Sequence, residues 1–156
     1  MSRAANETIP PTTLSRFRAC LLGGAAGDAL GAPVEFLTGN DIRQQHGPDG
    51  LTAFHPAYGR LGAITDDTQM SMFTAEGLLR AWAAARGKVG AQCRRQVARA
   101  YMRWYQTQND AGRQRAQDLR NADGYLLQQP ELYARRGPGN TCMSALSEMR
   151  RVTKQA

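Results

Sequence analysis

The stretch Gly62-Ala63-Ile64-Thr65-Asp66-Asp67-Thr68-Gln69-Met70 is a loop that turns into a helix, with two adjacent carboxylates at the turn. Thr65 is predicted to be the N-cap residue, because its hydroxyl can accept a hydrogen bond from an unpaired backbone N–H of the first turn. Asp66 and Asp67 then fall in that first turn, and helix-compatible residues continue from Gln69 to Ala85. The sequence therefore predicts a long helix that starts at an acidic end.

The two aspartates and the threonine form a candidate metal site. Successive helical residues point about 100° apart, so Asp66 and Asp67 do not share a face and suit two cations better than one. Together with the Thr65 oxygen they are hard ligands, of the kind that Mg²⁺, Ca²⁺ or Mn²⁺ prefers. The alternative is structural, because acids are common in the first turn of a helix, where the helix dipole favours negative charge. The same dipole opposes a cation, so a metal site here needs further carboxylates from elsewhere.

Composition indicates one globular domain. A chain of 156 residues is long enough for a single sizeable core. The net charge of +7 comes from 20 Lys and Arg against 13 Asp and Glu, and Lys88 and Lys154 are the only lysines. This arginine excess fits a phosphate-bearing partner, but the compositional bias of a GC-rich genome is the favoured explanation. Cys20, Cys93 and Cys142 are far apart and odd in number, which argues against a disulfide framework and fits a reducing cytoplasm.

The sequence carries no recognisable targeting or membrane-spanning segment. Residues 1–11 are polar, end in Pro10-Pro11, and are predicted to be a flexible tail ahead of a domain at 12–156. They lack the apolar core of a secretory signal, and no apolar run approaches membrane-spanning length. We therefore expect a cytoplasmic protein that makes no membrane contact.

The first helix is predicted to start after a cap at Thr12 or Thr13 and to stop at Pro33. Its apolar stripe contains Leu14, Phe17, Leu21, Leu22 and Ala25. The stripe runs into four glycines at 23, 24, 27 and 31, which suggest that another backbone or a ligand approaches closely. Asp28 lies among them. Glu35 follows in an apolar run, either as a solvated loop residue or as a carboxylate aimed into a cleft.

Further helices are predicted at 39–45 with a cap near Asn40 or Asp41, at 92–106, and after a cap at Asn140. The helix after Thr65 is expected to bury Met70, Phe73, Gly77, Leu78, Ala81 and Trp82, and the last helix to bury Met143, Leu146 and Met149. Residues 46–62 are predicted to be loop with His46 and His55 exposed, and 108–124 to be loop with a helical piece. No strand-like alternation or hairpin signal is present, so the expected class is all-α.

Two motifs together resemble a known family. The segment from Gly23 to Glu35, Gly-Gly-Ala-Ala-Gly-Asp-Ala-Leu-Gly-Ala-Pro-Val-Glu, is similar to the opening signature of the ADP-ribosylglycohydrolase family, of the dinitrogenase-reductase-activating glycohydrolase type. Thr65-Asp66-Asp67-Thr68-Gln69-Met70 resembles the first metal-binding motif of that family. Arg135-Arg136-Gly137-Pro138-Gly139-Asn140-Thr141-Cys142 resembles a third segment, a loop that enters a helix. The resemblance therefore extends from about Phe17 to Leu146.

This resemblance implies a fold, an activity and a set of site residues. Members of the family are compact orthogonal helical domains that cleave the glycosidic bond between ADP-ribose and a side chain or acyl group. They typically use two Mg²⁺ or Mn²⁺ ions. By position, Thr65, Asp66 and Asp67 would be metal ligands, and Glu35 would be the catalytic carboxylate, either metal-linked or a general acid/base. Asp28 would pack helices or support the ligands. The substrate would be an ADP-ribosylated protein or a small ADP-ribosyl conjugate.

The sequence also departs from the family pattern. The family has an Asp-x-Asp metal motif and a glycine-rich ADP-ribose segment nearer its C-terminus, and neither occurs here, since Glu148 is the only acid after Glu131. We therefore expect an apparently truncated domain, the N-terminal half of a family member. In that case a second chain would supply the missing metal ligands, and helix faces that pack on the missing half would be exposed.

Two other hypotheses rank below a hydrolase. One is a non-catalytic binding protein that recognises an ADP-ribosylating enzyme or its target. The other is a nucleic-acid-binding module that uses the basic stripe Arg95, Arg99 and Arg103. Such a stripe is more often a solvated helix face, so a nucleic-acid partner is not expected.

Overall fold

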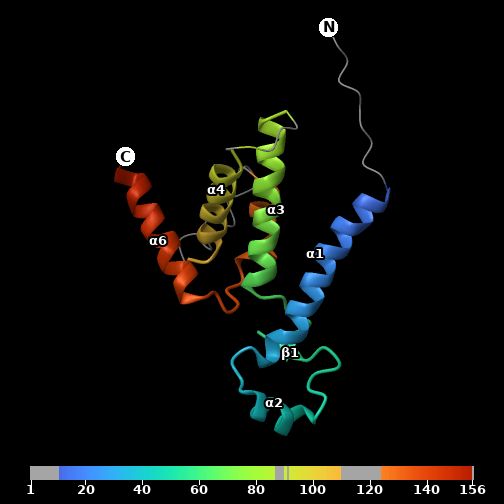
Figure 1. Cartoon of the computed structure of the whole chain (residues 1–156). Helices are drawn as coiled ribbons and strands as arrows, with labels where there is room; N and C mark the ends of the chain where they lie inside the picture. Colours follow the sequence, from blue (N-terminus) through green and yellow to red (C-terminus); the bar gives the residue numbers. More distant parts are fainter. Residues whose placement is uncertain (1–10, 87–89, 91, 110–123, 156) are drawn as a thin grey trace.

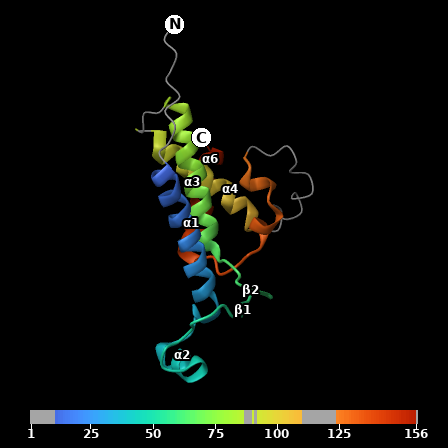
Figure 2. The ribbon, with the colours of Figure 1, turned by 90° about the vertical axis from the view of Figure 1, so that its right-hand side faces the viewer.

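The computed structural model describes residues 11–86, 90, 92–109 and 124–155. These residues form an all-α fold, as predicted, with one small β-pair (Figures 1 and 2). The longer helices are α1 (Pro11–Gly31), α2 (Gly39–His46), α3 (Asp66–Ala84), α4 (Gln92–Thr107) and α6 (Asn140–Gln155). Short 3₁₀ turns are η1 (Ala32–Val34), η3 (Leu126–Gln128) and η4 (Pro130–Tyr133), and the strands are β1 (Pro56–Ala57) and β2 (Arg60–Leu61).

The predicted helix boundaries agree with the structure to within a few residues. The first helix starts at Pro11, slightly before the predicted cap, and gives way to η1, which contains Pro33. The cap of α2 is Thr38 and not Asn40 or Asp41; Asp41 instead completes a reciprocal capping box with Thr38. The predicted tail, up to residue 10, and most of the predicted loop at 108–124 lie outside the described residues.

The core forms where α3 and α4 cross. Gly77 makes this crossing close, because a Cβ atom there would lie 2.8 Å from the Cα of Val97. In Figure 1, α4 lies between α3 and α6. The buried apolar cluster contains Phe73, Ala100, Trp104, Leu127, Leu132 and Leu146. The core thus joins α3, α4, α6 and the turns before α6.

The first helix contributes little to this core. In Figure 1, α1 leans away from α3 toward its N-terminal end. Its predicted apolar stripe is largely exposed at Leu14, Phe17, Leu21 and Leu22. A Cβ atom added at any of the glycines 23, 24, 27 and 31 would meet nothing within 4 Å, so the close approach expected there is not formed by the described residues.

Part of the predicted buried face of α3 is also exposed. Phe73, Gly77 and Ala81 are buried as expected, but Leu78 is 45% and Trp82 54% exposed. Leu78 and Trp82 each follow a buried residue by one position and so point about 100° around the helix, away from α4. That side of α3 has few described neighbours because α1 diverges from it.

Three further expectations are corrected. A hairpin joins β1 to β2, in a region predicted to be loop. His46 and His55 are half-buried and pack edge to face, with ring centroids 4.9 Å apart, instead of standing exposed. Arg103 pairs with Glu76 at 2.9 Å and has a largely buried side chain, so it does not belong to a solvated basic face with Arg95 and Arg99.

Among the described residues, no single helix is both long and apolar enough to cross a membrane. The segments 12–34 and 39–46 reach the required length and composition only as a pair, with a bend of 90° between them.

Candidate active site

Asp28 connects α1 to the start of α3. Its carboxylate accepts hydrogen bonds from the backbone N–H of Thr65 at 2.7 Å and from that of Thr68 at 3.2 Å. It also accepts from the two hydroxyls, that of Thr65 at 2.6 Å and that of Thr68 at 2.5 Å. The first turn of a helix has unpaired N–H groups, and a carboxylate satisfies them well because of its charge. Asp28 therefore fixes the loop that presents the two aspartates.

Thr65 is the N-cap of α3, as the sequence predicts. Its hydroxyl oxygen accepts a hydrogen bond from the backbone N–H of Asp67 at 3.3 Å. Asp66 is buried whereas Asp67 is exposed, which agrees with the expectation that the two side chains occupy different faces. The helix start therefore offers one sheltered and one solvent-facing carboxylate.

The loop before α6 packs against this helix start. The backbone carbonyl of Arg136 accepts a hydrogen bond from the N–H of Asp66 at 3.0 Å. Its buried guanidinium donates to the carbonyl of Ile64 at 3.2 Å. Burial and the charge of Asp67 raise the pKa of Asp66, and the N–H of Gly139 partly offsets them. The third family-like segment thus lies directly on the acidic motif.

A buried polar network holds the same loop from below. The side-chain amide of Gln69 donates to the carbonyl of Ala134 at 2.9 Å. Its oxygen accepts from the indole of Trp104 and from the amide of Gln108, both at 3.0 Å. Gln69 and Trp104 are fully buried, so these bonds are costly to break. The network therefore fixes how closely the loop before α6 packs against α3.

Glu35 belongs to the same acidic cluster. Partial desolvation raises the pKa of its carboxyl, and the charges of Asp66, Asp67 and Asp28 add to this effect. A hydrogen bond with the Tyr58 hydroxyl acts in the opposite direction. Glu35 remains exposed at the surface of the molecule. The structure therefore places Glu35 within electrostatic reach of the two aspartates, which are about thirty residues away in the sequence.

The oxygen donors of the site match a divalent cation in chemical type. The carboxylates of Glu35, Asp66 and Asp67 are hard oxygen donors, and their mutual repulsion is what a cation would relieve. The Thr65 hydroxyl donates its proton to Asp28 and accepts the N–H of Asp67, so its oxygen keeps one lone pair for a further partner. Among the residues that the structure describes, no three His, Cys, Asp or Glu side chains lie close enough to hold a metal ion. The donors fit the cation in chemistry but supply only part of a coordination shell.

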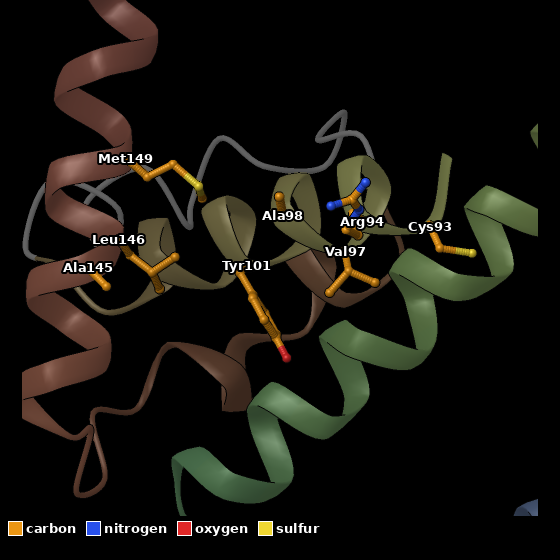
Figure 3. Close-up of a pocket in the computed structure, with 8 residues that line it drawn as sticks. All are labelled: Cys93, Arg94, Val97, Ala98, Tyr101, Ala145, Leu146 and Met149. Atoms are coloured by element: carbon orange, nitrogen blue, oxygen red, sulfur yellow. The ribbon is translucent and has the colours of Figure 1, made fainter. Parts of the chain in front are cut away.

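A separate hollow between α4 and α6 is a poor candidate for chemistry (Figure 3). It has a volume of about 460 Å³ and is lined mainly by apolar side chains, including Val97, Leu146 and Met149. Of its polar residues, Tyr101 has its hydroxyl within 2.8 Å of that of Thr74. Catalytic pockets combine apolar walls with several convergent polar groups, whereas the polar side chains that line this hollow, Cys93, Arg94 and Tyr101, all come from α4.

Sequence reasoning found the acids of the site but not their supports. Tyr58 carried no sequence signal, because its hairpin uses Tyr-Gly and not the Asn-Gly or Asp-Gly pair that marks two-residue turns. Gln69 lies in the motif from Thr65 to Met70, but its role depends on Trp104, a contact between α3 and α4 that a linear pattern does not reveal. Arg136 likewise lay in a quoted segment without an assigned contact.

These features define a class: a helical domain with a carboxylate-rich site at the start of a central helix. A family model described as ADP-ribosylglycohydrolase matches residues 9–156. The chain therefore belongs to the ADP-ribosylglycohydrolase family, which confirms the resemblance seen in the motifs.

Two curated relatives match a shorter part of the chain. An uncharacterized protein of Archaeoglobus fulgidus is 48% identical over 67 residues, which is 41% of this chain and 21% of the relative. The ADP-ribosyl-[dinitrogen reductase] glycohydrolase of Rhodospirillum rubrum is 43% identical over 68 residues, 40% of this chain and 21% of that enzyme. The aligned segment thus spans about a fifth of each relative. No solved structure matches the chain significantly.

Proposed function

We propose that this chain carries the first half of the active site of a metal-dependent hydrolase that removes ADP-ribose from a modified protein side chain or another ADP-ribosyl conjugate. The observation that supports it most is the electrostatic interaction of Glu35 with Asp66 and Asp67, in a chain of the ADP-ribosylglycohydrolase family. Like charges are costly to gather unless a cation or a reaction uses them.

Each residue has a proposed role. Thr65, Asp66 and Asp67 would hold Mg²⁺ or Mn²⁺, with two ions in the complete site. Such ions polarise substrate oxygens and lower the pKa of a bound water. Glu35, at the solvent-facing side of the cluster, would act at the glycosidic bond, whose cleavage passes through an oxocarbenium-like transition state. Asp28 would act only through Thr65 and Thr68, by fixing the loop.

The rest of the coordination shell would come from beyond the described residues, for example from a second chain. This follows from the incomplete set of acids at the site among the described residues.

The test is release of ADP-ribose from ADP-ribosylated arginine and serine substrates in the presence of Mg²⁺ or Mn²⁺. In a preparation that contains the remaining ligands, we expect release that stops on chelation and in the Asp66→Asn/Asp67→Asn double variant. Asp49→Asn, which removes an exposed acid from the loop after α2, is the matched control and should keep full activity. Release that survives both chelation and the double substitution would exclude the proposed metal role.

The incomplete acid set also favours a second candidate, a binding protein that keeps the family fold without catalysis. This candidate predicts binding of ADP-ribose or of an ADP-ribosylated protein without a divalent cation. Titration calorimetry with ADP-ribose, with and without Mg²⁺, separates the two. Metal-independent binding by a folded chain that releases no ADP-ribose would select the binding protein.

A further inference from the structure

We infer that Tyr58 is a positioning residue of this site: a strained hairpin turn holds its hydroxyl against the carboxylate of Glu35, beside Gly137. The inference rests on the proposed function, because it assigns Tyr58 a role toward the carboxylate proposed to act at the glycosidic bond.

The turn itself is an unfavourable place for tyrosine. In the β1–β2 pair, Ala57 is opposite Arg60, so Tyr58 and Gly59 form a two-residue loop. Their φ angles are +49° and +78°, both in the left-handed region. A turn of this kind favours Asn-Gly, and a bulky side chain at its first position is strained. The Tyr58 ring is also 42% exposed, so burial of the ring does not account for its presence.

The hairpin is anchored to the loop that covers the acidic motif. Arg60, next to the turn, pairs with the Glu131 carboxylate at 2.5 Å. The buried guanidinium of Arg136 reaches the same carboxylate oxygen at 3.5 Å. Arg136 also accepts the N–H of Asp66 through its backbone. A chain of contacts through Glu131 and Arg136 therefore connects the turn to Asp66.

Gly137 leaves the space in which Tyr58 and Glu35 meet. A Cβ atom at Gly137 would lie 2.9 Å from the Tyr58 hydroxyl oxygen and 3.1 Å from Oε2 of Glu35. Gly137 has φ +69°, which also favours glycine. Tyr58, Glu35 and Gly137 are distant in sequence, yet they meet at the position that a side chain on residue 137 would occupy.

Glu35 needs such a donor. Its nearest charged neighbours are acids, which repel it, and the ion pairs of the described residues leave it without a cation. A phenol is protonated at neutral pH and can donate, and burial together with the charge of Glu35 raises the pKa of Tyr58 further. An uncharged donor therefore orients a carboxylate that would otherwise turn toward solvent.

The test compares Tyr58→Phe, which removes only the hydroxyl, with Tyr58→Asn, which suits the turn. Tyr125→Phe is the matched control, because Tyr125 is 73% exposed and far from the acids in sequence. Crystal structures and thermal unfolding are measured for each variant of the full chain. In both Tyr58 variants we expect the Glu35 carboxylate to move away from its position beside Gly137. We also expect Tyr58→Asn to unfold at a higher temperature than the wild type, because the strain in the turn is relieved. If the role of Tyr58 were merely structural, replacing it would not make the protein more stable.

The kinetic arm separates this inference from the proposed function. In a preparation that releases ADP-ribose, Tyr58→Phe should lower kcat about 10- to 100-fold with little change in KM, as for a mispositioned group. The effect should vanish in a Glu35→Gln background. A Glu35 carboxylate that stays in place in Tyr58→Phe, or a Tyr58→Asn variant that melts below the wild type, would overturn the inference. Displacement of Glu35 in a chain that never releases ADP-ribose would support the contact and count against the proposed function alone.

Discussion

The carboxylate of Asp28 accepts two hydrogen bonds from Thr65, one from its backbone N–H at 2.7 Å and one from its hydroxyl at 2.6 Å. This pair joins the end of α1 to the N-cap of α3. Because the Thr65 proton goes to Asp28, the Thr65 oxygen acts only as an acceptor: one lone pair takes the N–H of Asp67 and one remains for a further partner. One contact therefore both connects the two helices and prepares a proposed metal ligand.

Replacing Asp28 should destabilise the chain strongly, although its side chain is only half-buried. Asp28→Ala leaves two backbone N–H groups and two hydroxyls of the α3 cap without their acceptor. We expect a loss of about 3 kcal/mol in the free energy of unfolding, since hydrogen bonds to a charged group contribute about 1.5–3 kcal/mol each and part of the loss is recovered by water. Urea denaturation measures it. Asp49→Ala is the control and should change the midpoint little; equal midpoints for the two variants would refute the capping role.

The motif residues could be predicted from the sequence because their signals are local. Thr65 as N-cap, with Asp66 and Asp67 in the first turn, follows from capping preferences that act within four residues. The positions of Leu78 and Trp82 could not be predicted in this way. Helical spacing identifies an apolar face, but whether a face is covered depends on where α1 packs, which is a tertiary property. The role of Tyr58 could not be predicted for the same reason, since it depends on the tertiary contact with Glu35 and Gly137.

Two glycines in helices should respond to alanine in opposite directions. At Gly77 the new Cβ would lie 2.8 Å from the backbone of Val97, so α3 and α4 would have to separate. We expect Gly77→Ala to destabilise the chain by about 1–3 kcal/mol, as overpacking does. At Gly23 the Cβ meets nothing within 4 Å, and Gly23→Ala should stabilise α1 by about 0.5–1 kcal/mol. Thermal unfolding of both variants measures the difference, and a shift of the same sign in both would contradict it.

Gln69 should be needed for stability although it is polar and buried. Gln69→Leu preserves volume but removes the acceptor for the Trp104 indole and the donor to the Ala134 carbonyl. Each buried group left unpaired costs about 1–3 kcal/mol, so we expect a loss of about 2–4 kcal/mol in the free energy of unfolding. Guanidinium denaturation checks this value. If Gln69→Leu proves neutral, the network does not hold the loop.

The acidic cluster should make the metal-free chain less stable as the pH rises. Asp66 and Glu35 both have a pKa raised above the ordinary values of 3.8 and 4.5. A carboxyl of this kind binds its proton more tightly in the folded chain, so its stabilising contribution is complete below the ordinary pKa and is lost as the pH rises through the folded pKa. Asp66→Asn removes this loss, and its amide oxygen can still accept from Gly139. Relative to the wild type, the variant should therefore gain stability on going from about pH 4 to neutral pH.

Asp41 provides a control of opposite sign. Hydrogen bonds from the Thr38 hydroxyl and backbone lower the pKa of Asp41, so its contribution is present above 3.8 and is lost as the pH falls. Unfolding free energies of the wild type, Asp66→Asn and Asp41→Asn across this range, with and without Mg²⁺, therefore separate repulsion at the cluster from general acid denaturation. If Mg²⁺ binds the cluster, it should cancel the wild-type loss at neutral pH and have no such effect on Asp66→Asn. The contradicting result is a plot of unfolding free energy against pH that has the same shape for the wild type and Asp66→Asn, with or without Mg²⁺. It would show that the charge of Asp66 is not repelled by its neighbours, so that a cation has no repulsion to relieve.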